Sequence, residues 1–170
     1  MALRKILTTG QPALGKHCRE VTDFSPRLWE LLDDMKETLL AANGVGLAAP
    51  QVGILRRAVL VLETNVPEGE EEYVIELINP EVIECSGEQN GPEGCLSVPG
   101  EYGLVRRPMN VTVRAQDRNG KFFEVSGEGL TARAFCHEAD HLEGVLFTAL
   151  AERMLTQEEI SGGNDETEVD

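Results

Sequence analysis

The order of the predicted elements constrains the fold of this 170-residue chain more than any other feature. Apolar residues at helical spacing predict a long N-terminal helix over 26–42, with Ser25 as N-cap and a stop at Asn43-Gly44. A second helix is predicted over 130–142. The segments between them are strand-like and follow one another directly. This order predicts an α+β fold of mostly antiparallel strands rather than a doubly wound parallel sheet.

The strand predictions come from short apolar runs and from one turn signal. The apolar run 58–62 predicts a buried strand. Residues 111–115 and 122–125 predict a hairpin, because the Asn-Gly pair at 119 tolerates the positive φ that tight turns require. Composition at 75–84 is also strand-like, although Asn-Pro at 79 interrupts it. Irregular structure is predicted for the glycine-rich stretch 44–53, the acidic stretch 67–72 and the glycine- and proline-rich stretch 91–100.

Length and composition predict one domain followed by a tail. The chain is 41% hydrophobic, and it has no apolar run near the roughly 18–20 residues that span a bilayer. We expect a single domain over 1–155 and a disordered acidic tail over 156–170. The N-terminus lacks the long apolar segment of a signal peptide, which predicts a cytoplasmic protein with no membrane partner. Its four cysteines are then expected to be reduced.

The formal charge of −15 argues against a DNA-binding protein, because phosphate contacts require clustered Lys and Arg. The charge is unevenly distributed. Residues 58–105 contain 11 acidic and no basic residues, and the tail contains 6 more acidic residues. The remainder is slightly basic, with 13 acidic against 15 basic residues. The basic residues of this remainder include Arg56, Arg57, Arg106 and Arg107.

The strongest local signal is His137-Glu138-Ala139-Asp140-His141 in the second predicted helix. Residues four apart lie on one helix face, about 6 Å apart along the axis, so both imidazoles can reach one metal ion. Glu138 lies beside them and can take a proton from water and return it to a leaving group. The pattern therefore predicts a central metal-binding helix that carries the HEADH sequence.

Three hypotheses for the remaining ligands stay open on spacing alone. Cys95 lies in the stretch 91–100, where an accessible thiolate is expected. A zinc endopeptidase of the HExxH class needs a downstream carboxylate, for which only Glu158 or Glu159 is suitably placed. A structural zinc module would add Cys85, since such sites have four protein ligands and no water.

Three short motifs follow one another along the chain. They are Gly44-Val45-Gly46-Leu47-Ala48-Ala49-Pro50-Gln51, Glu93-Gly94-Cys95-Leu96-Ser97 and His137-Glu138-Ala139-Asp140-His141. In this order the chain resembles the peptide deformylase family, and the resemblance extends to about Leu155. It implies a metal-dependent hydrolase that removes the N-formyl group from the formyl-methionine of newly synthesised polypeptides and releases formate.

The resemblance also implies the metal ligands and the proton carrier. Cys95, His137 and His141 would hold one divalent metal ion. That ion would be Fe²⁺, with Zn²⁺, Ni²⁺ or Co²⁺ as alternatives, since mixed imidazole and thiolate ligands accept all four. Glu138 would act as general base and then as general acid for the water that attacks the formyl carbon.

Further roles follow from the same resemblance. Gln51 and the backbone N–H of Leu96 would stabilise the oxyanion. The side chain after the formyl group would enter a pocket that accepts unbranched methionine. No role is assigned to Arg133. The residues implied to bind substrate are Val45, Gly46, Gly94, Leu130 and Ala134.

The implied partners are N-formyl-methionyl nascent peptides. We keep a transient contact with the ribosome as a hypothesis, because the part of the chain outside 58–105 and the tail is slightly basic. The acidic tail is not the segment expected to make that contact.

Overall fold

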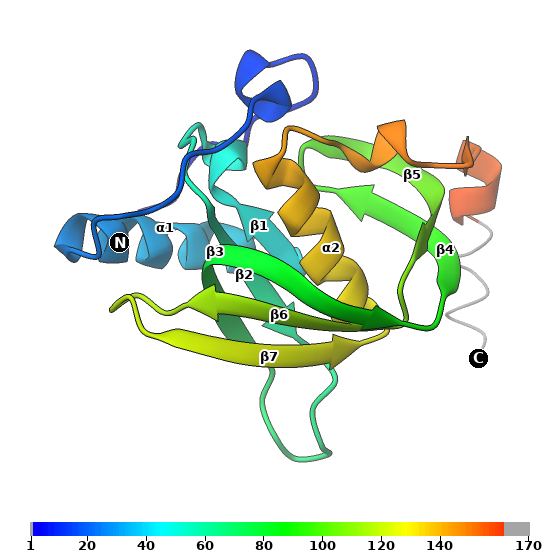
Figure 1. The fold of residues 1–170 in the computed structure, drawn as a ribbon. Helices are drawn as coiled ribbons and strands as arrows, with labels where there is room; N and C mark the ends of the chain where they lie inside the picture. The colour runs from blue at the N-terminus through cyan, green and yellow to red at the C-terminus, as the bar shows by residue number, and fades with distance from the viewer. Residues whose placement is uncertain (1, 162–170) are drawn as a thin grey trace.

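The computed structural model describes residues 2–161, which form two antiparallel sheets with one helix in contact with both. A five-stranded sheet has the order β1-β2-β3-β6-β7, and a three-stranded sheet has the order β4-β5-β8 (Figure 1). The elements are η1 (Pro12–Gly15), α1 (Pro26–Ala41), β1 (Gly46–Ala48), η2 (Ala49–Val52), β2 (Ala58–Glu63), β3 (Tyr73–Ser86), β4 (Gln89–Cys95), β5 (Val98–Arg107), β6 (Asn110–Gln116), β7 (Phe122–Glu128), α2 (Leu130–Leu142), η3 (Phe147–Ala149) and β8 (Arg153–Met154). The predicted α+β class and antiparallel pairing are confirmed.

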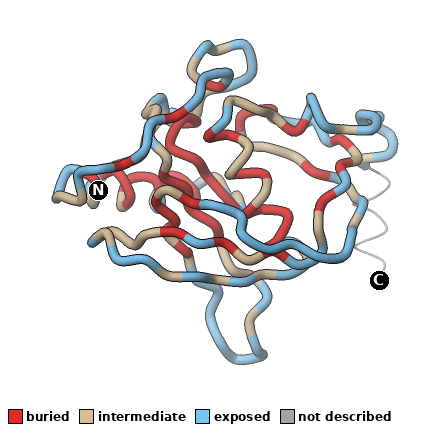
Figure 2. Tube along the Cα trace, viewed as in Figure 1, coloured by how far each residue is buried: buried red, intermediate tan, exposed pale blue. Residues whose placement is uncertain are grey.

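The five-stranded sheet is covered by a helix on each face. The continuous apolar run of β2 explains this, because alternate side chains of a strand point to opposite faces. Val59 and Val61 belong to the cluster that includes Phe135 of α2, whereas Leu60 packs with Met35 of α1. Buried positions accordingly gather where the two helices meet the sheet (Figure 2). The buried strand predicted over 58–62 is therefore confirmed.

The predicted helices also match the structure closely. The helix predicted over 26–42 is α1, and Asn43 takes the positive φ of 55° that ends it. Ser25 is the N-cap residue, but its hydroxyl donates to Asp23 rather than capping a backbone N–H. The helix predicted over 130–142 is α2.

Two stretches predicted to be irregular contain strands. Residues 44–53 include the short strand β1, which pairs with β2, and the turn η2. The stretch 91–100 was also predicted wrongly, because it spans β4 and the start of β5. Pro92 pairs with Leu104 in β4. A proline is tolerated there because β4 is an edge strand, whose outer side has no neighbouring strand to accept a hydrogen bond from the backbone.

The interruption predicted at Asn79-Pro80 does not end the strand. β3 runs through it with a register shift between Ile78 and Glu81, and Asn79 adopts a φ of 52°. The Asn79 side chain accepts a hydrogen bond from the Val21 N–H and donates one to the Val21 carbonyl. The irregularity is thus a bulge that anchors the N-terminal segment to the sheet.

The tail prediction concerns residues that are only partly described. Residues 157–161 are helical, and residues 162–170 lie outside the described part of the chain. All four cysteines are free, as predicted. Within residues 2–161, no helix combines the length and apolar character needed to cross a bilayer.

Replacing Leu39 with Ala tests the packing of α1. Leu39 is fully buried, whereas its neighbour Leu40 is 47% exposed, so the two variants share a helix but not an environment. We expect L39A to lower the free energy of unfolding by about 2–5 kcal/mol. L40A should change it by about 0.5 kcal/mol at most. Urea unfolding measures both, and equal losses would contradict the orientation of α1.

Candidate metal centre

Three potential metal ligands from two elements converge at the end of the three-stranded sheet. Cys95 ends β4, and His137 and His141 lie one turn apart on α2. Their donor atoms lie within 4.8 Å of one another. The two histidine Nε2 atoms are 3.2 Å apart, and Cys95 Sγ lies 3.3 Å from His141 Nε2.

The Nε2–Nε2 and Sγ–Nε2 separations match those around one divalent ion, and the third pair of donors stays within 4.8 Å. Donors at about 2.0–2.3 Å from a tetrahedral ion lie about 3.3–3.6 Å from one another. Three protein donors leave one position of such a set for water or substrate. Sets of this kind are typical of catalytic rather than structural metal sites.

The two buried histidines differ in their affinity for protons. Burial and the neighbouring His137 lower the pKa of His141 to about 3, so His141 is neutral at pH 7. At His137, burial is outweighed by Glu138, Cys95 and Glu93, which raise the pKa of His137 well above its usual value. A metal ion competes with that proton, because a ligating imidazole must be neutral.

Glu93 holds His137 from the side opposite the other donors. Its Oε2 accepts a hydrogen bond from His137 Nδ1 at 2.7 Å, which leaves Nε2 to face Cys95 and His141. Burial alone would raise the pKa of Glu93, but hydrogen bonds from His137 and Arg107 hold it at about 2. Glu93 is therefore a permanent anion behind the first histidine.

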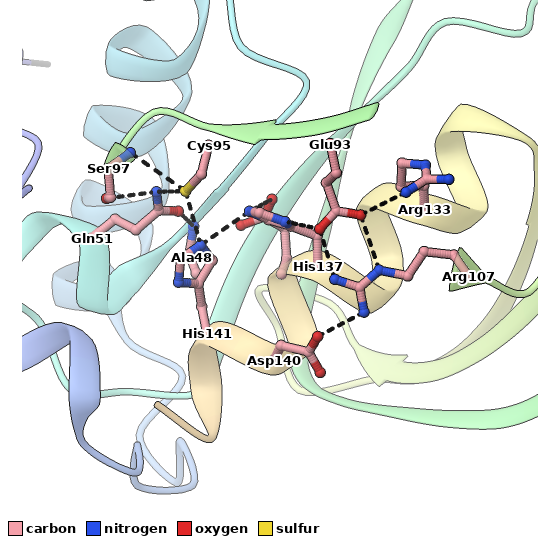
Figure 3. A network of polar contacts seen from close by, with 11 residues as sticks. Ala48, Gln51, Glu93, Cys95, Ser97, Arg107, Arg133, His137, Asp140 and His141 are labelled. Atoms are coloured by element: carbon pink, nitrogen blue, oxygen red, sulfur yellow. Dashed lines mark hydrogen bonds and ion pairs between the residues drawn. The ribbon is translucent and has the colours of Figure 1, made fainter. Parts of the chain in front are cut away.

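Two arginines surround Glu93 (Figure 3). Arg107 donates to both carboxylate oxygens at 3.0 and 2.7 Å, and also to Asp140 at 2.7 Å. Arg133 donates through Nη1 to Glu93 Oε1 at 2.9 Å and to the Val105 carbonyl at 3.0 Å. Two guanidinium groups thus balance two carboxylates beside the site.

The sequence analysis missed this network. Arg107 was named only among the basic residues outside 58–105 and the tail, yet it is 7% exposed and belongs to this network. Arg133 received no role, although its position four residues before His137 places both on one helix face. The four-residue spacing from Arg133 to His137 could have indicated that Arg133 lies beside the candidate ligands. Nothing near Arg107 in the sequence indicated that it is buried.

Gln51 is held with its amide nitrogen toward the candidate ligands. Its Oε1 accepts from the Ala48 N–H at 2.9 Å, and its Nε2 donates to Ser97 Oγ at 3.0 Å. The same Nε2 lies 3.5 Å from Cys95 Sγ. Because the oxygen is engaged by Ala48, the side-chain amide has one orientation, with donors directed at the site.

Glu138 is buried beside the candidate ligands and has few polar contacts. It is 3% exposed, its Oε1 has no hydrogen-bond partner among the described residues, and burial raises its pKa to about 7. Its Oε2 lies 4.0 Å from His137 Nε2. A Cβ on Gly46 would lie 2.4 Å from Glu138 Oε2, so only glycine lets β1 approach this carboxylate.

A cavity of about 450 Å³ opens onto this group of residues. Cys95, His137, Glu138 and Gln51 line it, whereas His141 is fully buried behind them. Six further residues named by the sequence analysis also line the cavity, namely Leu96, Val45, Gly46, Gly94, Leu130 and Ala134. The fold therefore brings every sequence-predicted site residue to one place.

The ligands of the two alternative sites lie elsewhere. Glu159 forms an ion pair with Arg153 at 2.7 Å, and neither Glu158 nor Glu159 joins the group of metal-ligating side chains found in residues 2–161. Cys85 is exposed on β3 and also lies outside that group. The geometry thus favours Cys95 as the third ligand over both alternatives.

Comparisons with known proteins agree on one family. A sequence model described as Polypeptide deformylase matches residues 3–156. The peptide deformylase of Caldanaerobacter subterraneus subsp. tengcongensis is 51% identical over 162 residues, covering 95% of this chain and 98% of that protein. That of Agathobacter rectalis is 53% identical over 155 residues, covering 91% and 94%.

Solved structures give the same result. The peptide deformylase of Thermotoga maritima superimposes with a TM-score of 0.82 at 35% identity, covering 89% of this chain and 99% of that one. A class I type b peptide deformylase from Acinetobacter baumannii, bound to Met-Ala-Ser, has a TM-score of 0.81 at 36% identity, covering 88% and 98%.

Replacing Glu93 with Gln tests the network around His137. The variant leaves two buried guanidinium groups short of a carboxylate, so we expect a loss of about 3–5 kcal/mol in unfolding free energy and weaker metal binding. The matched control is E88Q, because Glu88 pairs with Arg106 at the surface, where such pairs contribute about 0–1 kcal/mol. Urea unfolding and Co²⁺ titration measure the two effects. An E93Q protein as stable as E88Q would contradict the network.

Proposed function

Because the chain belongs to the polypeptide deformylase family, and is thus a hydrolase that removes the N-formyl group from newly synthesised polypeptides, we propose that Cys95, His137 and His141 hold its metal ion. The family is metal-dependent. The spacing of the three donor atoms, which suits one tetrahedral ion, is the observation that carries this assignment.

We propose Fe²⁺ as the native ion, on the basis of family membership and the mixed imidazole and thiolate donors. When bound, a divalent ion supplies Lewis acidity that polarises the formyl carbonyl and activates water. His137 is oriented for this role by Glu93, and Cys95 is oriented by the N–H of Ser97, which lies 3.4 Å from Sγ.

Glu138 is proposed to carry the proton. Its Oε2 lies 4.0 Å from His137 Nε2, its Oε1 has no partner among the described residues, and the residue lines the cavity through which water can enter. Burial raises its pKa to about 7, so the carboxyl group can hold or release a proton near neutral pH. In the proposed reaction Glu138 takes a proton from the attacking water and delivers it to the amine nitrogen of the departing peptide.

Gln51 and Leu96 are proposed to stabilise negative charge on the formyl oxygen. The Gln51 amide is already oriented by Ala48 and Ser97, so it needs no reorganisation as the charge develops. The backbone N–H of Leu96 follows directly after the ligand Cys95, which places a second donor at the same end of the cavity. Removing one such donor typically lowers kcat by about 10²–10³-fold.

The peptide is proposed to bind in extended form between the two sheets. β1 and β4 are edge strands of their respective sheets, and residues of both line the cavity. Val45, Gly46 and Gly94 can offer main-chain groups to a substrate strand. Leu130 and Ala134 on α2 would form apolar walls for the methionine side chain. N-formyl-methionyl nascent peptides are the partners that this geometry suits.

The cellular setting follows from this substrate. We propose that residues 1–155 act as one catalytic domain in the cytoplasm, where nascent peptides are made. The ribosome contact stays a hypothesis, and the residues available for it are fewer than the sequence suggested. Arg107 is buried, Arg57 is paired with Glu143, and the exposed Arg106 is paired with Glu88 and Glu152. Of the four arginines named above, this leaves Arg56 exposed and without an ion pair among the described residues.

Replacing Glu138 with Gln tests the proposed proton transfer. We expect E138Q to keep its metal content but to release formate from formyl-Met-Ala about 10²–10⁴-fold more slowly, because the amide cannot exchange the proton. E143Q, at the exposed end of the same helix, should retain parent activity. Formate release by E138Q at the parent rate would show that another group carries the proton.

Metal analysis of anaerobically purified protein tests the proposed ion. We expect iron, and we expect the activity of the iron-loaded protein to decay in air through oxidation of the iron and of Cys95. C95S should lose activity or bind a different metal, because it removes the thiolate. Stable aerobic activity of the iron-loaded parent would contradict iron as the native ion.

A further inference from the structure

Arg133 has hydrogen-bonding capacity that the network around Glu93 does not use. The residue is 7% exposed and lines the cavity. Only its Nη1 donates to the described residues, to Glu93 and to the Val105 carbonyl. A guanidinium group has five N–H donors, so Nε and Nη2 retain donors without a protein acceptor in residues 2–161.

Unused donors in the wall of a cavity favour an acceptor from the ligand that fills it. Neither nitrogen is among the fully buried side-chain atoms that lack a partner in residues 2–161, so both are open to the cavity, and a ligand atom that accepts from them gains a charge-assisted contact. The neighbouring walls, Leu130 and Ala134, are apolar and offer no competing acceptor through their side chains. The contact is therefore available to whatever side chain fills this part of the cavity.

The position of Arg133 along α2 indicates which substrate atom it meets. Arg133 precedes His137 by four residues, about 6 Å along the helix axis and on the same face. A side chain that starts near the reacting formamide and runs along this face passes Ala134 before it reaches Arg133. In methionine the third atom beyond Cα is the thioether sulfur, which is a soft and weak acceptor.

We propose that Arg133 is a specificity-determining residue that donates an N–H to the thioether sulfur of the substrate methionine. This inference rests on the proposed function, in which the methionine side chain enters the α2 pocket. Apolar walls alone discriminate poorly between sulfur and a methylene group of similar size. With Arg133 in the wall, the pocket distinguishes methionine from norleucine, which has a methylene group in place of the sulfur.

The experiment compares formyl-Met-Ala-Ser with formyl-Nle-Ala-Ser on the metal-loaded protein. We expect the parent to prefer the methionine peptide by about threefold to tenfold in kcat/KM, through a lower KM, as one modest hydrogen bond would give. R133M keeps an apolar chain of similar length but no donor, and its preference should fall to about one. The matched control R114M, at an exposed position on β6, should keep the parent preference.

A second measurement uses the reaction products and does not depend on turnover. Met-Ala-Ser should bind the parent about threefold to tenfold more tightly than Nle-Ala-Ser by calorimetry. If Arg133 only positioned Glu93, R133M would slow both substrates equally and leave the methionine preference unchanged, which would overturn the proposal.

Equal binding of the two products by the parent would overturn it as well, and that comparison requires no variant to fold. Failure of the metal-loaded parent to release formate from either peptide would count against the proposed function itself, and not only against this contact.

Discussion

The carboxylate of Glu93 is the group on which the geometry of the site depends. It joins three elements, because it lies on β4, accepts from Arg107 of β5 and accepts from His137 and Arg133 of α2. Cys95 lies two residues after Glu93, past a register shift between Gly94 and Cys95, and both side chains leave the end of β4 toward α2 (Figure 3). Fixing Glu93 to α2 therefore also sets how closely the Cys95 sulfur approaches the two histidines. The ion network determines the separation of the candidate ligands.

The same cavity gives two glutamates opposite properties. Glu93 has two guanidinium partners and a histidine, so its pKa is about 2 and it stays charged. Glu138 is as deeply buried, but it lacks such partners, and burial raises its pKa to about 7. Opposite shifts of paired carboxyl groups are typical of sites that separate a fixed charge from a proton carrier. The network thus supplies a permanent charge to orient His137 and leaves Glu138 free for the proposed proton transfer.

Local patterns predicted much of this site, and long-range pairing accounts for what they missed. The His137 to His141 spacing, the hairpin and both helices depend on neighbours in sequence, and the structure agrees with them. Strand β4 was missed because its regularity comes from pairing with β5, which overrides its glycines and proline. The burial of Arg107 was missed for a related reason. Its charge predicts exposure, and only the partners Glu93 and Asp140, brought in by the fold, make its burial tolerable.

The glycines at the cavity explain how one site can serve many peptides. A Cβ on Gly46 would lie 2.4 Å from Glu138 Oε2, and one on Gly94 would lie 2.5 Å from the Tyr102 ring. β1 can therefore approach Glu138 only as bare backbone, whereas the absence of a side chain at Gly94 leaves room for the Tyr102 ring beside β4. Main-chain hydrogen bonds between a substrate and such edge strands do not depend on the substrate's side chains. In the proposed binding mode, selectivity comes from the α2 wall, where the first side chain of the peptide would meet Leu130, Arg133 and Ala134, and sequence beyond that residue could vary.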